Sequence, residues 1–315
     1  MDVGFLVITI SLSLREIPGV ALQKSHNCSL HRVMHLGRPA RKLRTTCCMS
    51  RIYAFVALFV MGLLSGCGTL SNGRGWGQDA TPFPGWHRIH NAAIKAAIEP
   101  GTWIPAAAAA VLQIGDFDEN LSDWAVDHTP IFGSQDRAKR TSECLLGAAG
   151  LGYLATALAA PSGEDRKQWS AAKLKGITVG AAALSLNLGV TEILKDGAHR
   201  TRPDASNEES FPSHHASSAA VFATLASRNL QSLAISHRAR NLLQLGFTTL
   251  AAGSAWARVE GKRHYPSDVL AGYAIGHFLS AFVNDAFLGL DNSHDLVLII
   301  EPSRNSLIVG LRWVY

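Results

Sequence analysis

The sequence predicts an all-α fold, a bundle of about six core helices followed by a short C-terminal β-hairpin. Long segments rich in Ala, Leu and Gly recur along the chain, and each is longer than an average strand. Loops rich in Pro, Gly and charged residues separate them. The expected helices cover residues 103–115, 141–160, 170–196, 215–230, 239–257 and 266–289.

The C-terminal segment, residues 291–315, has a different pattern. Two runs rich in β-branched and aliphatic residues flank the turn-like sequence EPSRNS. This pattern predicts a hairpin that packs on the helices. A terminal aromatic residue also occurs in membrane barrels, but two strands cannot close a barrel.

The N-terminal region resembles a bacterial lipoprotein signal. Residues 49–66 begin at Met49, carry one early basic residue and contain an apolar run that is short for a membrane span. They end in LSG directly before Cys67, which resembles a lipobox whose cysteine is lipidated. We therefore expect translation to start at Met49, residues 1–48 to be an over-extended gene start, and residues 67–85 to form a flexible tether.

The net charge of +5 comes from this N-terminal region. Eight of the 29 basic residues but only two of the 24 acidic residues precede residue 67, which leaves 21 basic and 22 acidic residues after it. A nearly neutral body argues against nucleic acid as a partner. With a lipid anchor, the expected location is the periplasmic side of a bacterial envelope, and Gly68 after the cysteine favours the outer membrane.

Two of the expected helices are long enough to span a bilayer, so a multi-pass inner-membrane protein is the alternative. These segments consist mainly of Ala, Gly, Ser and Thr, and polar residues such as Asn187 and Glu192 interrupt the apolar runs. We therefore expect a water-soluble domain, residues 86–290, that the lipid anchor holds at a membrane surface. The sequence carries no signature of an oligomeric state.

Three short blocks place charged and imidazole side chains at helix ends or in adjoining loops. They read KDGAHRTRP, PSHH and RVEGKRHYPSD, and they start at Lys195, Pro212 and Arg258. Lys195, Arg202 and Arg258 would repel one another unless they surround a multiply charged anion, for which phosphate is the obvious candidate. Ser213 is a suitable N-cap, and the free backbone N–H groups of a helix N-terminus also favour an anion.

The histidines beside these cations predict nucleophilic attack and proton transfer. His264 precedes the first turn of the last core helix, where Asp268 can reach back to the imidazole and fix its tautomer. His215 lies in a first turn and can give a proton to a leaving oxygen. We expect the neighbouring His214 side chain to face solvent, because a first-turn residue need not point to the site.

Together the blocks resemble the type 2 phosphatidic acid phosphatase (PAP2) superfamily, which includes bacterial acid phosphatases and vanadium haloperoxidases. The family pattern is K-x6-RP, PSGH and SR-x5-H-x3-D, and the resemblance covers roughly residues 140–285. The chain departs from the pattern at two positions, where His214 replaces the glycine and Ala257 replaces the serine. The matching residues are Lys195, Arg202, Pro203, Pro212, Ser213, His215, Arg258, His264 and Asp268.

The resemblance implies a phosphatase that hydrolyses phosphate monoesters, expected here to be lipid phosphates such as phosphatidic acid. It implies that His264 attacks phosphorus to form a phosphohistidine, that Asp268 orients His264, and that His215 protonates the leaving alkoxide. It requires no metal or other cofactor. The residues implied to hold the phosphoryl oxygens are Lys195, Arg202, Ser213 and Arg258.

Three alternatives stand beside this interpretation. A vanadium haloperoxidase would bind vanadate as its cofactor in the same cradle, whereas a phosphatase would bind it only as a phosphate mimic. A non-catalytic envelope lipoprotein would keep the cradle without turnover. Residues 116–127, DFDENLSDWAVD, resemble a calcium loop, but Leu121 and Asp127 stand where Gly and Glu belong, so we expect an acidic loop between helices.

Overall fold

The structure is a computed structural model that describes residues 68–290 and the backbone of residues 296–303 and 306–313. The chain divides into two units, one formed by Ile52–Asp291 and the other by Met1–Arg51 together with Asn292–Tyr315. Residues 1–48, the signal at residues 49–66 and the lipidation site Cys67 lie outside the described residues, so these expectations stay predictions.

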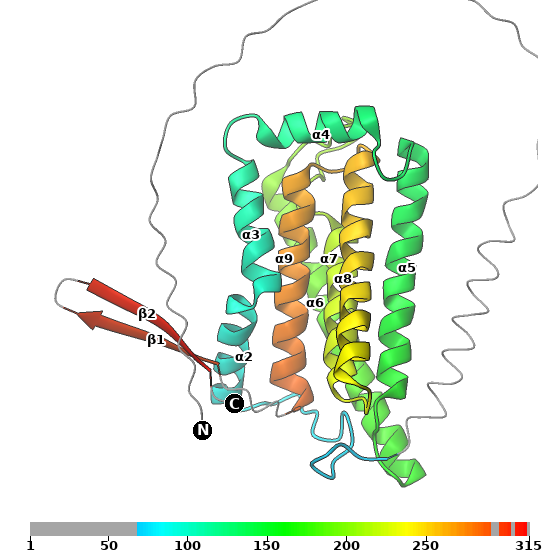
Figure 1. The fold of residues 1–315 in the computed structure, drawn as a ribbon, viewed down its shortest axis with the longest axis vertical. Coiled ribbons are helices and arrows are strands. Elements are labelled where there is room, and N and C mark those ends of the chain that lie inside the picture. The colour runs from blue at the N-terminus through cyan, green and yellow to red at the C-terminus, as the bar shows by residue number, and fades with distance from the viewer. Residues whose placement is uncertain (1–67, 291–295, 304–305, 314–315) are drawn as a thin grey trace, which may run out of the picture. The chain divides into compact units, whose positions relative to one another are not determined.

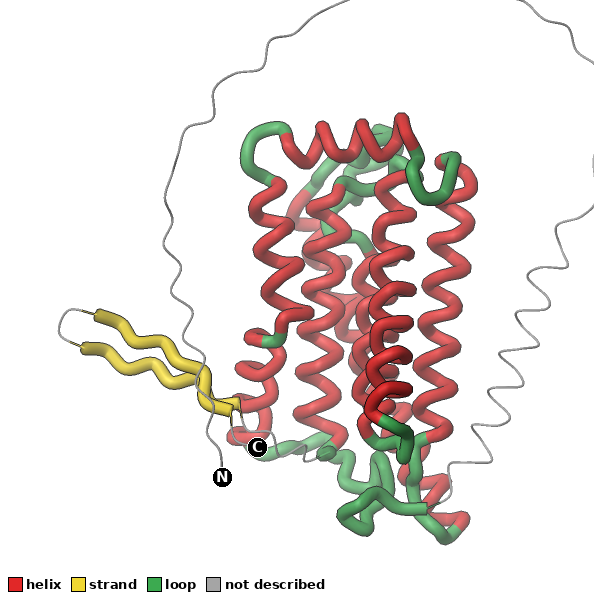
Figure 2. Tube along the Cα trace, in the orientation of Figure 1, coloured by secondary structure: helices red, strands yellow, loops and turns green. Residues whose placement is uncertain are grey.

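The larger unit is a bundle of long helices with a shorter helix, α4, lying across one end (Figure 1). Loops connect the helices, and the described part of this unit is mostly helical (Figure 2). The predicted helical class is therefore confirmed. The helices are α2 (Trp86–Ile98), α3 (Pro100–Leu112), α4 (Phe117–His128), α5 (Gln135–Ala159), α6 (Arg166–Ala198), α7 (His214–Gln231), α8 (His237–Glu260) and α9 (Pro266–Val283), which the π-helical segment η1 (Asn284–Leu288) extends.

The six predicted helices correspond to α3 and α5 to α9, and α2 and α4 are additional. The expectation of an acidic loop at residues 116–127 was wrong, because most of this stretch forms α4. Asp118 and Glu119 lie in its first turn, where negative charge is favourable. Asp118 is also buried and paired with an arginine, Arg200, so it is not a ligand in an open calcium loop.

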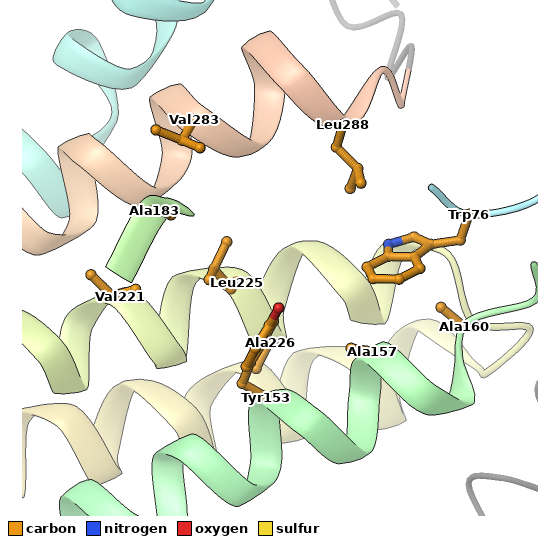
Figure 3. Packing of buried hydrophobic residues seen from close by; sticks show 10 residues of the cluster. All are labelled: Trp76, Tyr153, Ala157, Ala160, Ala183, Val221, Leu225, Ala226, Val283 and Leu288. Carbon is orange, nitrogen blue, oxygen red and sulfur yellow. The ribbon is translucent and has the colours of Figure 1, made fainter. Parts of the chain in front are cut away.

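Part of the segment expected to be a flexible tether packs on the bundle. Trp76 is buried in the main hydrophobic cluster, together with Tyr153 of α5 and Leu225 of α7 (Figure 3). Its backbone N–H donates to the carbonyl of Pro161. Burying a tryptophan gains much more free energy than a solvated linker residue can, which explains why this stretch is fixed.

Small residues bring α7 and α9 close together, and this approach positions the candidate site. A Cβ atom added at Gly272 or Gly276 of α9 would lie 2.7 Å from the Ser213 carbonyl oxygen or 2.1 Å from the Ser217 carbonyl oxygen. Any larger residue at these two positions would push the helices apart. The two glycines therefore allow the N-terminal half of α7 to pack directly against α9.

The other unit contains β1 (Leu296–Ser303) and β2 (Ser306–Trp313). The strands pair antiparallel, from Leu296 opposite Trp313 to Ser303 opposite Ser306. Their side chains lie outside the described residues. The expectation that this hairpin packs on the helices therefore stays a prediction.

Two helices in the described part of the chain, α5 and α6, are long and apolar enough to cross a membrane. In the most apolar 18-residue stretch of each helix, only 33% of α5 and 22% of α6 is buried inside the protein. Large apolar side chains such as Leu154 and Leu186 face outward from these helices. This surface is consistent with association of the domain with a membrane.

Candidate active site

The three motif blocks meet at one end of the bundle, the end that α4 crosses (Figure 1). Lys195 and Arg258 lie in the last turns of α6 and α8. Ser213 is the N-cap of α7, and His264 precedes α9, whose first turn contains Asp268. All but one of the predicted site residues in these blocks are buried, namely Lys195, Arg202, Ser213, Arg258, His264 and Asp268.

The imidazole of His264 is held with one nitrogen committed to the backbone. Its Nδ1 lies 2.7 Å from the carbonyl oxygen of Ser210, which can only accept a hydrogen bond. Nδ1 must therefore carry the proton, and Nε2 is left with its lone pair. Burial, followed by the charge of Arg258, lowers the pKa of His264 well below its usual value. The ring is therefore neutral at neutral pH, as a nucleophile requires.

Asp268 does not reach His264 as expected. Its carboxylate accepts hydrogen bonds from the backbone N–H of Tyr265 at 2.9 Å, from the Ser210 hydroxyl at 2.5 Å and from Arg200 at 2.6 Å. The expected contact with His264 does not form, because a carboxylate at the third position of a helix accepts a hydrogen bond from the N-cap backbone N–H, here that of Tyr265. Asp268 is thus linked to His264 through Ser210, whose hydroxyl and carbonyl contact the two residues.

Arg200 is a site residue that the motif spacing does not predict. Its guanidinium donates to Asp268 and, at 2.7 Å, to Asp118 of α4, and it stacks on the ring of Tyr265. Asp118 also accepts hydrogen bonds from the backbone N–H and hydroxyl of Ser267. Burial raises the pKa of Asp268 although Arg200 opposes the rise. This network fastens α4 to the N-terminus of α9 and fixes the carboxylate behind His264.

Lys195, Arg202 and Arg258 form what we call the cationic cradle. Burial lowers the pKa of Arg258 to about 10, and repulsion from Arg263 and Arg202 adds to this effect. The Nε atoms of Arg202 and Arg258 are buried and have no hydrogen-bond partner within residues 68–290. Buried donors of this kind are costly unless they meet an acceptor. The cradle therefore has the charge and the donors to bind an anion.

Three glutamates line the exposed side of the cradle. Glu143 of α5 lies 3.9 Å from Arg258, Glu192 of α6 lies 3.9 Å from Lys195, and Glu209 lies 3.5 Å from Arg202. Their side chains are 63%, 55% and 54% exposed, respectively. Glu192 stands three residues before Lys195 on α6, so local helix spacing could have identified it, whereas Glu143 comes from a different helix and could not be found in this way. Water screens such pairs, so they neutralise the cradle only weakly.

The paired histidines of α7 have different surroundings. Nε2 of His215 lies 2.8 Å from the carboxylate of Glu143. Burial and the charge of Arg258 lower the pKa of His215, while Glu143 opposes this shift. The expectation that His214 faces solvent was wrong. Its half-buried ring lies with Nδ1 3.2 Å from Lys195 and Nε2 3.1 Å from Glu192, because the first turn of α7 packs beside the last turn of α6.

Ser213 is engaged in structural hydrogen bonds. Its hydroxyl accepts from the backbone N–H of Ala216, and its own backbone N–H donates to the carbonyl of Asp268 at 3.1 Å. It thus caps α7 as predicted and ties α7 to α9, while its predicted contact with phosphate stays a prediction. Among the described side chains, no group of three or more His, Cys, Asp or Glu is arranged to hold a metal ion.

Comparisons with known proteins show which family the part of the chain that contains these blocks resembles. The chain has no match among curated proteins. A crystal structure of a transmembrane PAP2 type phosphatidylglycerolphosphate phosphatase from Bacillus subtilis matches 63% of this chain and 94% of its own, with 20% identity and a TM-score of 0.43. Residues 176–288 match the model of the PAP2 superfamily. That range contains all three blocks, from Lys195 to Asp268, and is therefore similar to this superfamily.

Proposed function

We propose that the protein is a phosphatase that hydrolyses phosphate monoesters through a phosphohistidine intermediate. The observation that carries this proposal is the unprotonated Nε2 of a neutral, buried His264 beside the cationic cradle. Arg258 and Arg202 are close enough to His264 to shift its pKa. Both also have a buried Nε without a partner in the described residues. A phosphate group would satisfy these donors and bring phosphorus to the nucleophile.

In the first step, the lone pair of His264 Nε2 attacks phosphorus and the bond from phosphorus to the ester oxygen breaks. His215 gives its proton to that oxygen, so an alcohol leaves and a phosphohistidine remains. In the second step, neutral His215 takes a proton from water, the oxygen of which attacks phosphorus and frees His264. The cradle holds the three phosphoryl oxygens throughout. Asp268 and Ser210 keep the proton on Nδ1.

Lipid phosphates are the proposed substrate class. A cavity of about 600 Å³ between α3 and α9 has a mainly apolar lining that includes Ala106, Phe211 and Ala271. Arg200 and Ser267, which belong to the network behind His264, line it as well. Such a cavity suits an acyl chain near the site. The apolar surfaces of α5 and α6 support a location at a membrane, where we propose that the lipid anchor at Cys67 holds the domain in the bacterial envelope.

Phosphate release by the purified protein in the presence of a chelator tests the reaction. Phosphatidic acid in mixed micelles and a soluble aryl phosphate would serve as substrates. His264→Ala should lose on the order of 10⁴-fold in rate or more, because the intermediate cannot form. His237→Ala, an exposed histidine at the start of α8, is the matched control and should retain the wild-type rate. Equal slow release by His264→Ala and wild type would contradict the proposal.

Two substitutions in α3 test whether the substrate is a lipid phosphate whose acyl chain occupies the apolar cavity. Ala106→Phe fills the apolar cavity, whereas Ala107→Phe adds the same ring at the neighbouring exposed residue, which is not among the residues that line the cavity. Ala106→Phe should raise the KM for phosphatidic acid several-fold and leave the KM for the soluble ester unchanged. Equal effects of both variants on both substrates would show that the acyl chain lies elsewhere.

A further inference from the structure

Glu143 of α5 has an unusual set of partners. Its Oε1 atom lies 2.8 Å from Nε2 of His215 and 3.9 Å from Nη1 of Arg258. These are the two groups that the proposed reaction uses to protonate the leaving oxygen and to hold a phosphoryl oxygen. A carboxylate oxygen between them is a negatively charged acceptor, like the phosphate oxygen that must bind there.

Another glutamate shows what a structural carboxylate looks like in this protein. Glu260 is fully buried, and its oxygens accept hydrogen bonds from the backbone N–H groups of Ile131 and Phe132 and from the indole of Trp256. These donors shape the turn between α4 and α5. By contrast, the contacts described for Glu143 are with His215 and Arg258 alone, so it supports no backbone segment.

The Glu143 carboxylate can also move away from the cradle. Its side chain is 63% exposed, while that of Arg258 is 8% exposed. It thus reaches the cradle from the solvent side, and a rotamer change at its own side chain is enough to move it into water. An ion pair with an exposed carboxylate is weak, so a phosphate ester can displace it.

We propose that Glu143 competes with a bound phosphate group for His215 and Arg258. Any phosphate group must displace the carboxylate in order to bind, so the competition weakens binding of free phosphate and of a phosphate ester by the same factor. Glu143 would therefore favour release of the phosphate product from the cradle. This inference rests on the proposed function, since it assumes that phosphate binds in the cradle.

Calorimetric titration of the purified protein with inorganic phosphate tests the competition. Glu143→Gln keeps the size of the side chain but removes its charge, and it should lower the Kd for phosphate about two- to fivefold. Glu143→Asp, which is too short to keep both contacts, should also bind phosphate more tightly. Glu164→Gln makes the same change in net charge at an exposed loop residue and should match wild type within error.

Unchanged or weaker phosphate binding by Glu143→Gln would overturn the inference, and a lower kcat in that variant would then assign Glu143 to positioning His215. Arg202→Ala separates this result from failure of the proposed function, because Arg202 has no described contact with Glu143. If Arg202→Ala loses phosphate binding while Glu143→Gln does not change it, only the competition is wrong. If Arg202→Ala binds phosphate like wild type, the cradle itself is not the phosphate site, and both ideas fail.

Discussion

Buried arginines meet carboxylates in two regions of the bundle, and the two regions differ in how closely the charges pair. Arg228 of α7 donates to Glu99 at 2.7 Å and to Asp285 at 3.1 Å. The side chains of these acids are only 21% and 15% exposed. In the cradle, the carboxylates nearest to Arg202 and Arg258 lie at 3.5 Å and 3.9 Å and are mostly exposed.

The pKa values of the two kinds of arginine move in opposite directions. Burial alone would lower the pKa of Arg228, but Asp285 and Glu99 outweigh it and raise the value. At Arg258, burial and repulsion from Arg263 prevail and lower the pKa to about 10. The charge of the first arginine is balanced by two close carboxylates, although its buried Nε also has no partner within residues 68–290. The second is a poorly compensated cation, as expected where the natural partner is a ligand.

The histidines of the two regions give the sharpest contrast. His215 and His277 each lie near a glutamate, and the pKa of each is lowered first by burial. His215→Ala removes the proposed proton donor and should cost about 10²–10⁴-fold in kcat. His277→Ala should lower stability but leave the rate per folded molecule within about twofold. Steady-state kinetics with active-site titration would check this. A similar loss of rate in both variants would contradict the proposed role of His215 as proton donor.

Exchanging the two arginines for methionine should separate activity from stability. Arg228→Met removes the closest charged partner of Glu99 and Asp285, which keep ion pairs with His277 at 3.6 Å and Lys95 at 3.3 Å, and should cost about 3 kcal/mol in the free energy of unfolding. Arg258→Met should lower kcat about 10²–10³-fold, because a transition-state donor is lost. Its stability should be unchanged or higher, since one repelled charge disappears. Urea denaturation and phosphate release measure the two effects, and equal destabilisation by both variants would contradict the contrast.

The pH dependence should place the activity optimum on the acidic side. The reaction needs neutral His264 and protonated His215, and kcat/KM reports both groups in the free enzyme. The pKa of each lies below its usual value, so kcat/KM should already fall as the pH rises through a value below about 6.5.

Arg258→Met provides the internal reference for this profile. Removing its charge removes one cause that lowers the pKa of His215, so the falling limb should move to higher pH. Ionisation of the substrate is the same in both proteins and cancels from the comparison. A falling limb that is unmoved in Arg258→Met would show that another group supplies the proton.

The cradle was predictable from the sequence because its parts are local. Lys195 and Arg202 lie in one block, and the spacing from Arg258 to His264 and Asp268 fits one helix end and the start of the next. Three cations from separate segments that meet at one end of the bundle point to a multiply charged anion. The length and the Ala-, Leu- and Gly-rich composition of the segments likewise predicted most core helices, because both are properties of each segment by itself.

Residues that act across long sequence distances were not predictable in this way. Arg200 meets Asp118 82 positions away, and Glu143 meets His215 across 72 positions. No periodicity links such pairs, since they depend on which helices become neighbours. The same limit explains the error at Asp268. Spacing placed it within reach of His264, but the competing donors on Ser210, Tyr265 and Arg200 decided which contacts formed.

Trapping the intermediate tests the central claim most directly. Wild type and His264→Ala would be mixed with a phosphate ester, quenched in alkali, where phosphohistidine survives, and digested for mass spectrometry. The proposed mechanism predicts a phosphorylated peptide containing His264 in the wild type, formed within one turnover, and no phosphorylated peptide in His264→Ala. Turnover by the wild type with no phosphorylated histidine, or with the label on a different residue, would contradict it.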